Sequence, residues 1–220
     1  MRARMRADAR RNRELILRAA REVFVSQGPD IPLERVARRA GVGIATLYRN
    51  YANREALMRG VATATLTGIR RAAEQALDRE DEPFEALRRF AHVALSLRVG
   101  AVLPALSGRI QFDEELDELR SATVRPVLGL LTRAQEADQV RKDVVFGDIP
   151  LMIMRLSLLL PGDGLPEDAA LAHRQLRLYL DGLRPEADRT RGGSLPGPAI
   201  TPTHYEHITD RMVSGTRWLY

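Results

Sequence analysis

The residues best suited to chemistry in this sequence form a short run after two closely spaced glycines. Gly41 and Gly43 precede the segment 44–51, which reads Ile-Ala-Thr-Leu-Tyr-Arg-Asn-Tyr. Its hydroxyl, amide and guanidinium groups can bond base edges and phosphates, and its small apolar groups can contact thymine methyls. The glycines indicate a turn, and the run after them has helical spacing but is too short to be stable alone. These side chains therefore need neighbouring elements to hold them and an external partner to bind.

Helices predicted on both sides would hold this run. Asn12 is predicted to cap a first helix that ends at Gly28, and its apolar residues recur at helical spacing. Pro32 can occupy the first turn of a second helix, whose apolar residues form a single stripe. Asn53 is predicted to cap a fourth helix that runs to about Arg79. Three short helices followed by a longer one make a helix-turn-helix head.

The charge distribution favours a head that binds a polyanion. The 220 residues carry a net charge of +5, but residues 1–60 hold 14 arginines against six acidic residues, and the remainder of the chain has a net charge of −3. Such an asymmetry suits nucleic-acid binding, although a solvated basic surface has the same composition. The short run and its neighbours contain six arginines, which are too many to be buried: Arg35, Arg38, Arg39, Arg49, Arg54 and Arg59. They favour DNA binding over a plain helical hairpin inside an all-α core.

Composition argues against several other classes. The sequence contains no cysteine, which removes disulfides, thiolate nucleophiles and cysteine-based zinc sites. The basic N-terminus is followed by no apolar signal region, and the longest apolar run, 149–160, is interrupted and too short to span a bilayer. We therefore expect a soluble, cytoplasmic protein with no membrane partner.

An enzyme would need a nucleophile, a general base or a metal site, and no such set is apparent. The sequence has no P-loop, no dinucleotide-binding glycine motif and no isolated acid pair. His204 and His207 lie three residues apart near the C-terminus without an apparent third ligand. We expect no catalytic residue, no metal and no cofactor. A protein-interaction module that keeps the head shape without binding DNA is a second alternative, and Arg13, Arg49 and Arg54 argue against it.

The rest of the chain also reads as helix, without a strand pattern or a solenoid repeat. Prolines, glycines and acidic clusters divide it into helices near 83–98, 101–110, 116–138, 148–160 and 167–183. From about Arg184 the composition becomes rich in Pro, Gly and polar residues. We therefore expect an all-α fold of about nine helices in total. Its expected parts are a basic flexible arm (1–11), a helix-turn-helix domain (12–60), a second helical domain (61–184) and a tail (185–220), whose last residues either form a short docked helix or are disordered.

The segment from Asn12 to Val61 resembles the DNA-binding domain of the TetR family of transcriptional regulators. The matching stretches are ILRAAREVF, LERVARRAGVG, ATLYRNY and NREAL. Pro32 stands where the family often has a Ser or Thr that can contact phosphate, and Ala45 stands where glycine is frequent. The resemblance implies a ligand-responsive regulator that binds a near-palindromic operator as a homodimer and is released by a small apolar or amphipathic effector. Repression is the commoner mode in the family, and the sequence does not decide between repression and activation.

The resemblance also separates the roles of residues in the recognition helix. A helical wheel would place its larger apolar and tyrosine side chains on one buried face, whereas the resemblance turns only Leu47 and Tyr51 inward. Ile44 and Tyr48 then face the groove, and Arg49 is expected to make a bidentate contact to guanine. We expect Arg13 and Arg54 to hold phosphates, with assistance from helix N-termini. The predicted DNA-binding residues are Arg13, Ile44, Ala45, Thr46, Tyr48, Arg49, Asn50 and Arg54.

By the same resemblance, the body holds an effector between the head and a four-helix dimer interface. The segment 148–160 is apolar nearly all round, which is unusual for a lone surface helix, and 167–183 carries a leucine stripe. Predicted interface residues, which could instead be core of one chain, are Leu151, Leu158, Leu176, Tyr179, Leu180 and Leu183. Predicted effector-lining residues, which could also be plain core, are Phe90, Leu95, Phe112, Val127, Leu131 and Met154. His92 and Arg98 could orient the effector or be exposed.

Overall fold

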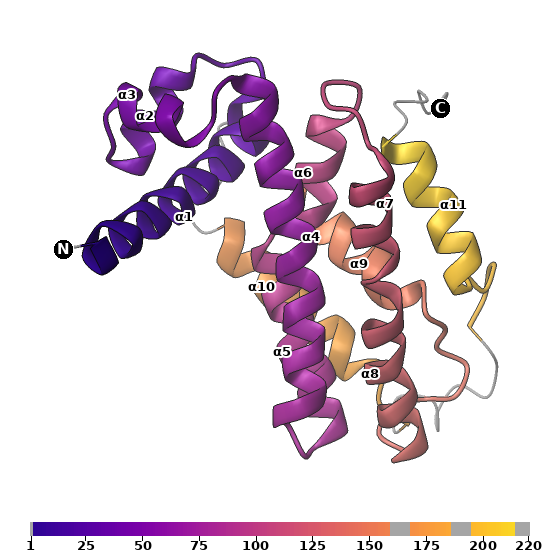
Figure 1. Ribbon diagram of the computed structural model, residues 1–220. Coiled ribbons are helices and arrows are strands. Elements are labelled where there is room, and N and C mark those ends of the chain that lie inside the picture. Colours follow the sequence, from indigo (N-terminus) through magenta and orange to yellow (C-terminus); the bar gives the residue numbers. More distant parts are fainter. Residues whose placement is uncertain (1, 159–167, 186–194, 214–220) are drawn as a thin grey trace.

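The computed structural model describes residues 2–158, 168–185 and 195–213, which form eleven α-helices and no strand. The predicted all-α fold is confirmed. Figure 1 shows a head at one end of the molecule and a bundle-like body, with the long α4 running from one into the other. The head comprises α1 (Arg2–Gln27), α2 (Leu33–Ala40), α3 (Ile44–Asn50) and the start of α4 (Arg54–Arg79).

The first helix begins earlier than predicted. It starts at Arg2, so Asn12 lies inside the helix and does not cap it. The prediction of a flexible arm over 1–11 is therefore wrong for the described residues. The stretch RARMRADARR explains the extension, because Arg, Ala and Met favour helix and no Pro or Gly interrupts them.

The turn between α2 and α3 depends on one glycine. Gly41 has a φ of 68°, in the left-handed region that side chains with a Cβ rarely adopt. Its N–H donates to the Arg38 carbonyl at 3.2 Å, and the Val42 N–H donates to the Ala37 carbonyl at 3.0 Å. These bonds end α2 and let the recognition helix α3 begin at Ile44.

The start of α4 follows the prediction closely. The Asn53 side chain accepts a hydrogen bond from the Ala56 N–H at 2.8 Å, which caps the helix. Pro32 precedes α2 as its N-cap residue and provides no side-chain hydrogen bond there. The α2 terminus thus lacks the hydroxyl cap that is frequent in the family.

Seven further helices build the body: α5 (Pro83–Ser96), α6 (Val99–Leu106), α7 (Glu114–Ser121), α8 (Val124–Glu136), α9 (Asp148–Leu156), α10 (Asp168–Asp181) and α11 (Pro202–Val213). The single helix predicted over 116–138 is two helices, which separate at Ala122 and Thr123. Pro126 falls in the first turn of α8, where a proline is tolerated, and the Thr123 hydroxyl donates to the Arg120 carbonyl at 2.7 Å. The expected tail contains α11, which lies along the body in Figure 1.

Two apolar cores divide the molecule, and α4 contributes to both. One core joins the head helices to α6 and α7, through buried residues such as Phe24, Leu47, Val102, Leu106 and Leu116. The other lies inside the body and gathers residues of α4, α5, α8, α9 and α10. Because α6 belongs to the head core and also contacts α9 and α11, it links the two parts.

One apolar stretch, 83–106, has the length and composition of a membrane-spanning helix. It consists of α5 and α6, which meet at a turn where Arg98 has a φ of 51°. Phe84, Leu87 and Val102 from this stretch are fully buried within the chain. Burial in the two cores accounts for its hydrophobicity.

Candidate nucleic-acid interface and effector cavity

The recognition helix turns one face into the head core and the other toward solvent. Leu47 and Tyr51 are 0% and 3% exposed, so their predicted inward orientation is confirmed. Ala45, Tyr48 and Arg49 are exposed. Ile44 is half-buried and packs against the head core, so it lies between the two orientations that the helical wheel and the resemblance predicted.

Hydrogen bonds within the helix order its polar side chains. The Arg49 guanidinium donates from Nη2 to the Thr46 hydroxyl at 2.8 Å, and the Asn50 amide donates to the Thr46 carbonyl at 2.8 Å. Arg49 is nevertheless exposed, with most of its five donors available in a fixed fork. A fork of this kind matches guanine O6 and N7 in the major groove.

The two arginines predicted to hold phosphates have structural contacts in the head. The Arg13 guanidinium carbon lies 5.1 Å from the centre of the Tyr51 ring, a cation–π distance. Arg54 donates from Nη1 to the Pro29 carbonyl at 2.6 Å and the Ile31 carbonyl at 2.7 Å. Arg54 therefore braces the loop between α1 and α2 against the start of α4. The sequence pattern did not predict this role, because it depends on residues more than 20 positions away.

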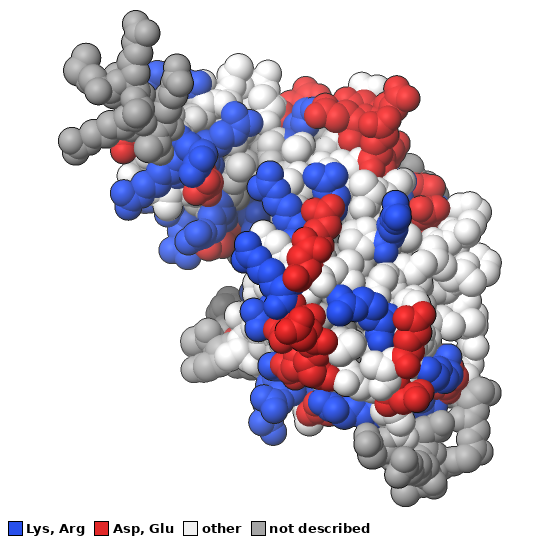
Figure 2. All heavy atoms as spheres, turned by 60° about the horizontal axis from the view of Figure 1, so that its bottom comes forward, with Lys and Arg blue, Asp and Glu red and all other residues white. Residues whose placement is uncertain are grey.

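Positive charge gathers over the head. Figure 2 shows Lys and Arg side chains crowded at the upper left, over the head, while both signs alternate across the body face that is in view. Some head arginines are paired, as in the 2.6 Å contact of Arg39 with Glu22. Arg11, Arg18 and Arg38 are exposed basic residues on α1 and α2. A surface of this kind attracts a polyanion to the head.

Ion pairs connect the head to the body at two places. The Arg59 guanidinium on α4 lies 2.7 Å from Asp113 and 2.8 Å from Glu115, at the start of α7. Arg109, which follows α6, lies 2.7 Å from Asp30 in the loop between α1 and α2. The hydrogen bonds from these guanidinium groups hold the pKa of Asp113 and of Asp30 below their ordinary values. The pairs are exposed, so they orient the contact more than they stabilise it.

A narrow cavity of about 60 Å³ lies in the body between α4, α5, α6, α7, α8, α9 and α11. Of the residues predicted to contact an effector, Phe90, Val127 and Met154 line it. Leu95 and Leu131 are buried in the body core away from its walls, and Phe112 packs against the head core. The polar side chains in the lining are Arg120, Thr123, Tyr205 and Thr209. Two of them come from α11, in a segment whose composition indicated a tail.

His92 and Arg98 do not line this cavity. His92 Nδ1 lies 2.8 Å from His173 Nδ1 on α10, and the two rings stack with centres 5.1 Å apart. Burial lowers the pKa of both imidazoles, with a further contribution from the charge of His173 on His92 and of Arg98 on His173. Arg98 pairs with Asp168 at 3.9 Å. No group of three or more His, Cys, Asp and Glu side chains in the described part of the chain is arranged to hold a metal.

The leucine stripe of α10 and the residue Leu183 after it face the chain's own core. Leu176, Leu180 and Leu183 are at most 5% exposed in the single chain, so they form core of one chain, the alternative that the sequence left open, and have almost no area left to bury against a second copy. Tyr179 is half-buried, and its hydroxyl donates to the Asp148 carbonyl of α9 at 2.8 Å.

Other apolar side chains on α10 and on or just after α9 are exposed or half-buried. Leu158 and Leu178 are 58% and 63% exposed, and Leu151 is half-buried. The sequence pattern did not single out Leu178. Its offset of two residues from both Leu176 and Leu180 is the signal that places it away from the buried stripe.

A head with an exposed recognition helix, carried on a helical body, defines a helix-turn-helix transcriptional regulator. Residues 16–61 match the model for bacterial regulatory proteins of the tetR family. Residues 82–185 match the model for the C-terminal domain of SbtR-like transcriptional regulators. An HTH-type transcriptional regulator of Mycobacterium tuberculosis is 32% identical over 132 residues, which cover 57% of this chain and 68% of the relative.

Solved structures show the same relationship. The TetR transcriptional regulator SCO0520 from Streptomyces coelicolor has a TM-score of 0.59 and 31% identity, over 79% of this chain and 98% of that chain. The TetR-like regulator LfrR from Mycobacterium smegmatis, solved in complex with proflavine, has a TM-score of 0.55 and 22% identity, over 86% of this chain and 99% of that chain. The chain belongs to the TetR family of transcriptional regulators, which bind DNA and are not enzymes.

Proposed function

We propose that the protein is a repressor that binds a near-palindromic operator as a homodimer and leaves it when a small apolar or amphipathic molecule enters the body. The observation that carries this proposal is the position of α6. Its residues Val99, Leu103 and Pro104 line the cavity, and Val102, Leu103 and Leu106 belong to the head core. Because the proposed partner is DNA, the proposed location of the protein is the cytoplasm.

The exposed face of α3 is the proposed reading surface. Arg49 is assigned to a guanine, Ala45 to a thymine methyl, and Asn50 and Thr46 to base edges or the backbone. Tyr48 is 48% exposed, so its hydroxyl can reach a phosphate. Arg13 and Arg54 are assigned to phosphates as well as to their contacts within the head.

Two copies of the chain are needed for a palindromic site, because one short recognition helix buries little surface on DNA. The exposed Leu158 and Leu178 and the half-buried Leu151, which lie on or next to the neighbouring helices α9 and α10, are the proposed contact surface for the second copy. This surface replaces the buried stripe of Leu176, Leu180 and Leu183 in the proposed dimer.

Coupling between effector and DNA is proposed to pass through α6. A molecule that widens the cavity presses on Leu103, which packs into the head core. The ion pairs of Arg59 and Arg109 would carry the same displacement to α4 and to the loop before α2. Two heads whose spacing changes no longer fit adjacent major grooves.

Selection from random duplex DNA at a fixed salt concentration tests the proposal. We expect enrichment of a palindrome, a complex with two chains per site by sedimentation, and release of that complex by a compound that fills the cavity. A transcription reporter carrying the selected site should fall in activity when the protein is expressed. Failure to enrich any palindrome would contradict the operator proposal, and a rise in reporter activity would contradict repression.

A further inference from the structure

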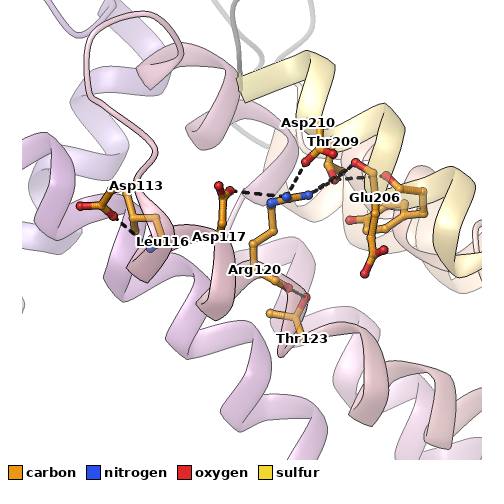
Figure 3. A network of polar contacts seen from close by, with 9 residues as sticks. Asp113, Leu116, Asp117, Arg120, Thr123, Glu206, Thr209 and Asp210 are labelled. Atoms are coloured by element: carbon orange, nitrogen blue, oxygen red, sulfur yellow. Dashed lines mark hydrogen bonds and ion pairs between the residues drawn. The ribbon is translucent and has the colours of Figure 1, made fainter.

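One end of the effector cavity is polar, and α7 and α11 build it together. Arg120 on α7 donates from Nη1 to the Thr209 hydroxyl at 2.7 Å, and its Nη2 pairs with Asp117 at 3.4 Å and with Asp210 (Figure 3). Its side chain is 12% exposed, and its Nε is buried without a hydrogen-bond partner. Arg120 therefore contributes a guanidinium group to the cavity lining, and one donor of that group has no hydrogen-bond partner.

Tyr205, on α11, adds a second poorly satisfied donor to the same cavity. Its hydroxyl has a contact of 3.8 Å with the Met154 sulfur, and a thioether is a weak acceptor. Burial raises the pKa of Tyr205 to about 12, so the hydroxyl keeps its proton at neutral pH. The Thr209 hydroxyl differs, because it accepts from Arg120 and lies 2.9 Å from the Glu206 carbonyl and 3.1 Å from the Tyr205 carbonyl.

Apart from the Thr123 and Thr209 hydroxyls, which donate to backbone carbonyls, the rest of the lining is apolar. Leu66, Ile69, Phe90 and Val127 are among the other lining residues. A buried donor without an acceptor is unfavourable. A ligand that supplies an acceptor is therefore bound in preference to a hydrocarbon of the same shape. The cavity thus selects a ligand with a hydrogen-bond acceptor and an apolar remainder.

The charges around Arg120 decide what kind of acceptor fits. Asp117 and Asp210 both pair with its guanidinium, so this cluster already carries a net charge of −1. A carboxylate ligand would add a further negative charge to a buried site, which is costly. A neutral carbonyl oxygen satisfies the donors without that cost.

We propose, building on the proposed effector site, that the effector is an uncharged, largely apolar carbonyl compound, such as a ketone or an ester, whose oxygen accepts hydrogen bonds from Tyr205 and Arg120. A water needs about 10–15 Å³ of such space, so the present cavity has room for a molecule of several heavy atoms. Tyr205 lies outside both segments that match the family models, 16–61 and 82–185. The C-terminal α11 therefore sets this ligand preference.

Calorimetry on the full chain with three probes of matched length tests this inference: butyl methyl ketone, hexane and pentanoate at neutral pH. We expect the ketone to bind at least about tenfold more tightly than hexane, because each buried donor that it satisfies contributes about tenfold, and pentanoate to bind more weakly than the ketone. Tyr205→Phe removes the hydroxyl and keeps the ring. It should reduce the ketone preference by about tenfold and leave hexane binding unchanged.

Tyr179→Phe is the matched control, because it removes a tyrosine hydroxyl whose partner is Asp148, away from the cavity. It should keep the ketone preference. The inference is overturned if Tyr205→Phe, with native circular dichroism, keeps the preference, if pentanoate binds more tightly than the ketone, or if none of the three probes binds. These titrations contain no DNA, so loss of operator binding would count against the proposed function alone.

Discussion

The head and the body of this regulator place their polar groups in opposite ways. In the head, α3 buries Leu47 and Tyr51 and presents Tyr48 and Arg49 to solvent. In the body, mostly apolar walls enclose a cavity, and two of its lining residues, Arg120 and Tyr205, carry poorly satisfied donors. Exposed donors are hydrogen-bonded to water before DNA binds, so they are not unfavourable in the free protein. Buried donors without acceptors make the empty cavity unfavourable. The head is thus suited to a large polar partner and the body to a small apolar one.

The helix α6 joins these two environments, so a substitution can affect one part or both. Changes confined to the body core should lower stability without a specific effect on DNA recognition. Changes on α3 should alter recognition with little effect on stability. Changes where α6 packs against α9 should affect both stability and DNA recognition.

The largest effect is expected from two leucines on α10. Leu180→Ala removes a side chain that is 0% exposed and should lower the free energy of unfolding by about 2–5 kcal/mol. Leu178→Ala, at 63% exposure, should change the unfolding of the monomer by less than about 0.5 kcal/mol. Denaturant titration at low protein concentration measures the free energies of unfolding of the two variants. Sedimentation measures dimer formation, which Leu178→Ala should weaken. Equal losses of stability would contradict the orientation of α10, and an unchanged dimer would contradict the proposed surface.

A glycine contact between α6 and α9 should produce the next largest effect. A Cβ on Gly100 would lie 2.3 Å from the Met154 carbonyl oxygen, so Gly100→Ala must displace one of the two helices. We expect a loss of about 1–3 kcal/mol in unfolding free energy and a change in operator affinity, because α6 also belongs to the head core.

Gly129→Ala provides the matched control for this test. Its added Cβ would make only ordinary contact with Leu77 at 3.6 Å, and alanine is favoured in a helix by about 1 kcal/mol. It should raise the melting temperature and leave DNA binding unchanged. If Gly100→Ala unfolds at the same denaturant concentration as the parent protein, the close approach of α6 and α9 is not a constraint.

Substitutions of two head arginines should distinguish base recognition from stabilisation of the loop between α1 and α2. Arg49→Ala should lower affinity for the selected operator by about 1–3 kcal/mol and relax the preference at one base pair, with unchanged thermal stability. Arg54→Ala removes the bonds to the Pro29 and Ile31 carbonyls, so it should lower the melting temperature and weaken all DNA sequences alike. Repeated selection and thermal denaturation on both variants measure these outcomes. A uniform loss of affinity in Arg49→Ala would show that this residue does not read a base.

Short-range rules explain why the head was predictable from the sequence. The left-handed turn at Gly41 and the Asn53 cap each depend on residues within a few positions, whereas the inward side of α3 was predicted by the resemblance and not by the helical wheel. The start of α1 was predicted too late because a local cap residue, Asn12, was preferred over the helix propensity of the residues before it. Arg54 shows the limit even here, since its partners lie far away in the chain.

The body depends on contacts between distant segments, which a single sequence does not specify. An apolar stripe predicts that a helix is covered but not by what, and Leu176 and Leu180 were assigned to a second chain when their own chain covers them. The cavity depends on α11 docking against Arg120, whose contacts with Glu206 and Thr209 span 86 and 89 residues of the chain. Its polar end could not be predicted from residues whose composition indicated a tail.

The smallest effect should come from the histidine pair between α5 and α10. Burial lowers the folded-state pKa of His92 and of His173 below the ordinary value of 6.5, so the unfolded chain binds protons more readily than the folded chain. Their contribution to stability is therefore complete above pH 6.5 and declines as the pH falls from there toward the lowered values. We expect the melting temperature to fall over this window, and His92→Gln to flatten that fall because only one titrating imidazole then remains at the contact. His204→Gln, which changes an exposed histidine on α11 outside the contact between α5 and α10, is the matched control. A melting temperature that rises on acidification through this window would show that protonation stabilises the pair. The neutral, stacked imidazoles, with their Nδ1 atoms 2.8 Å apart, would then not be what holds α5 and α10 together.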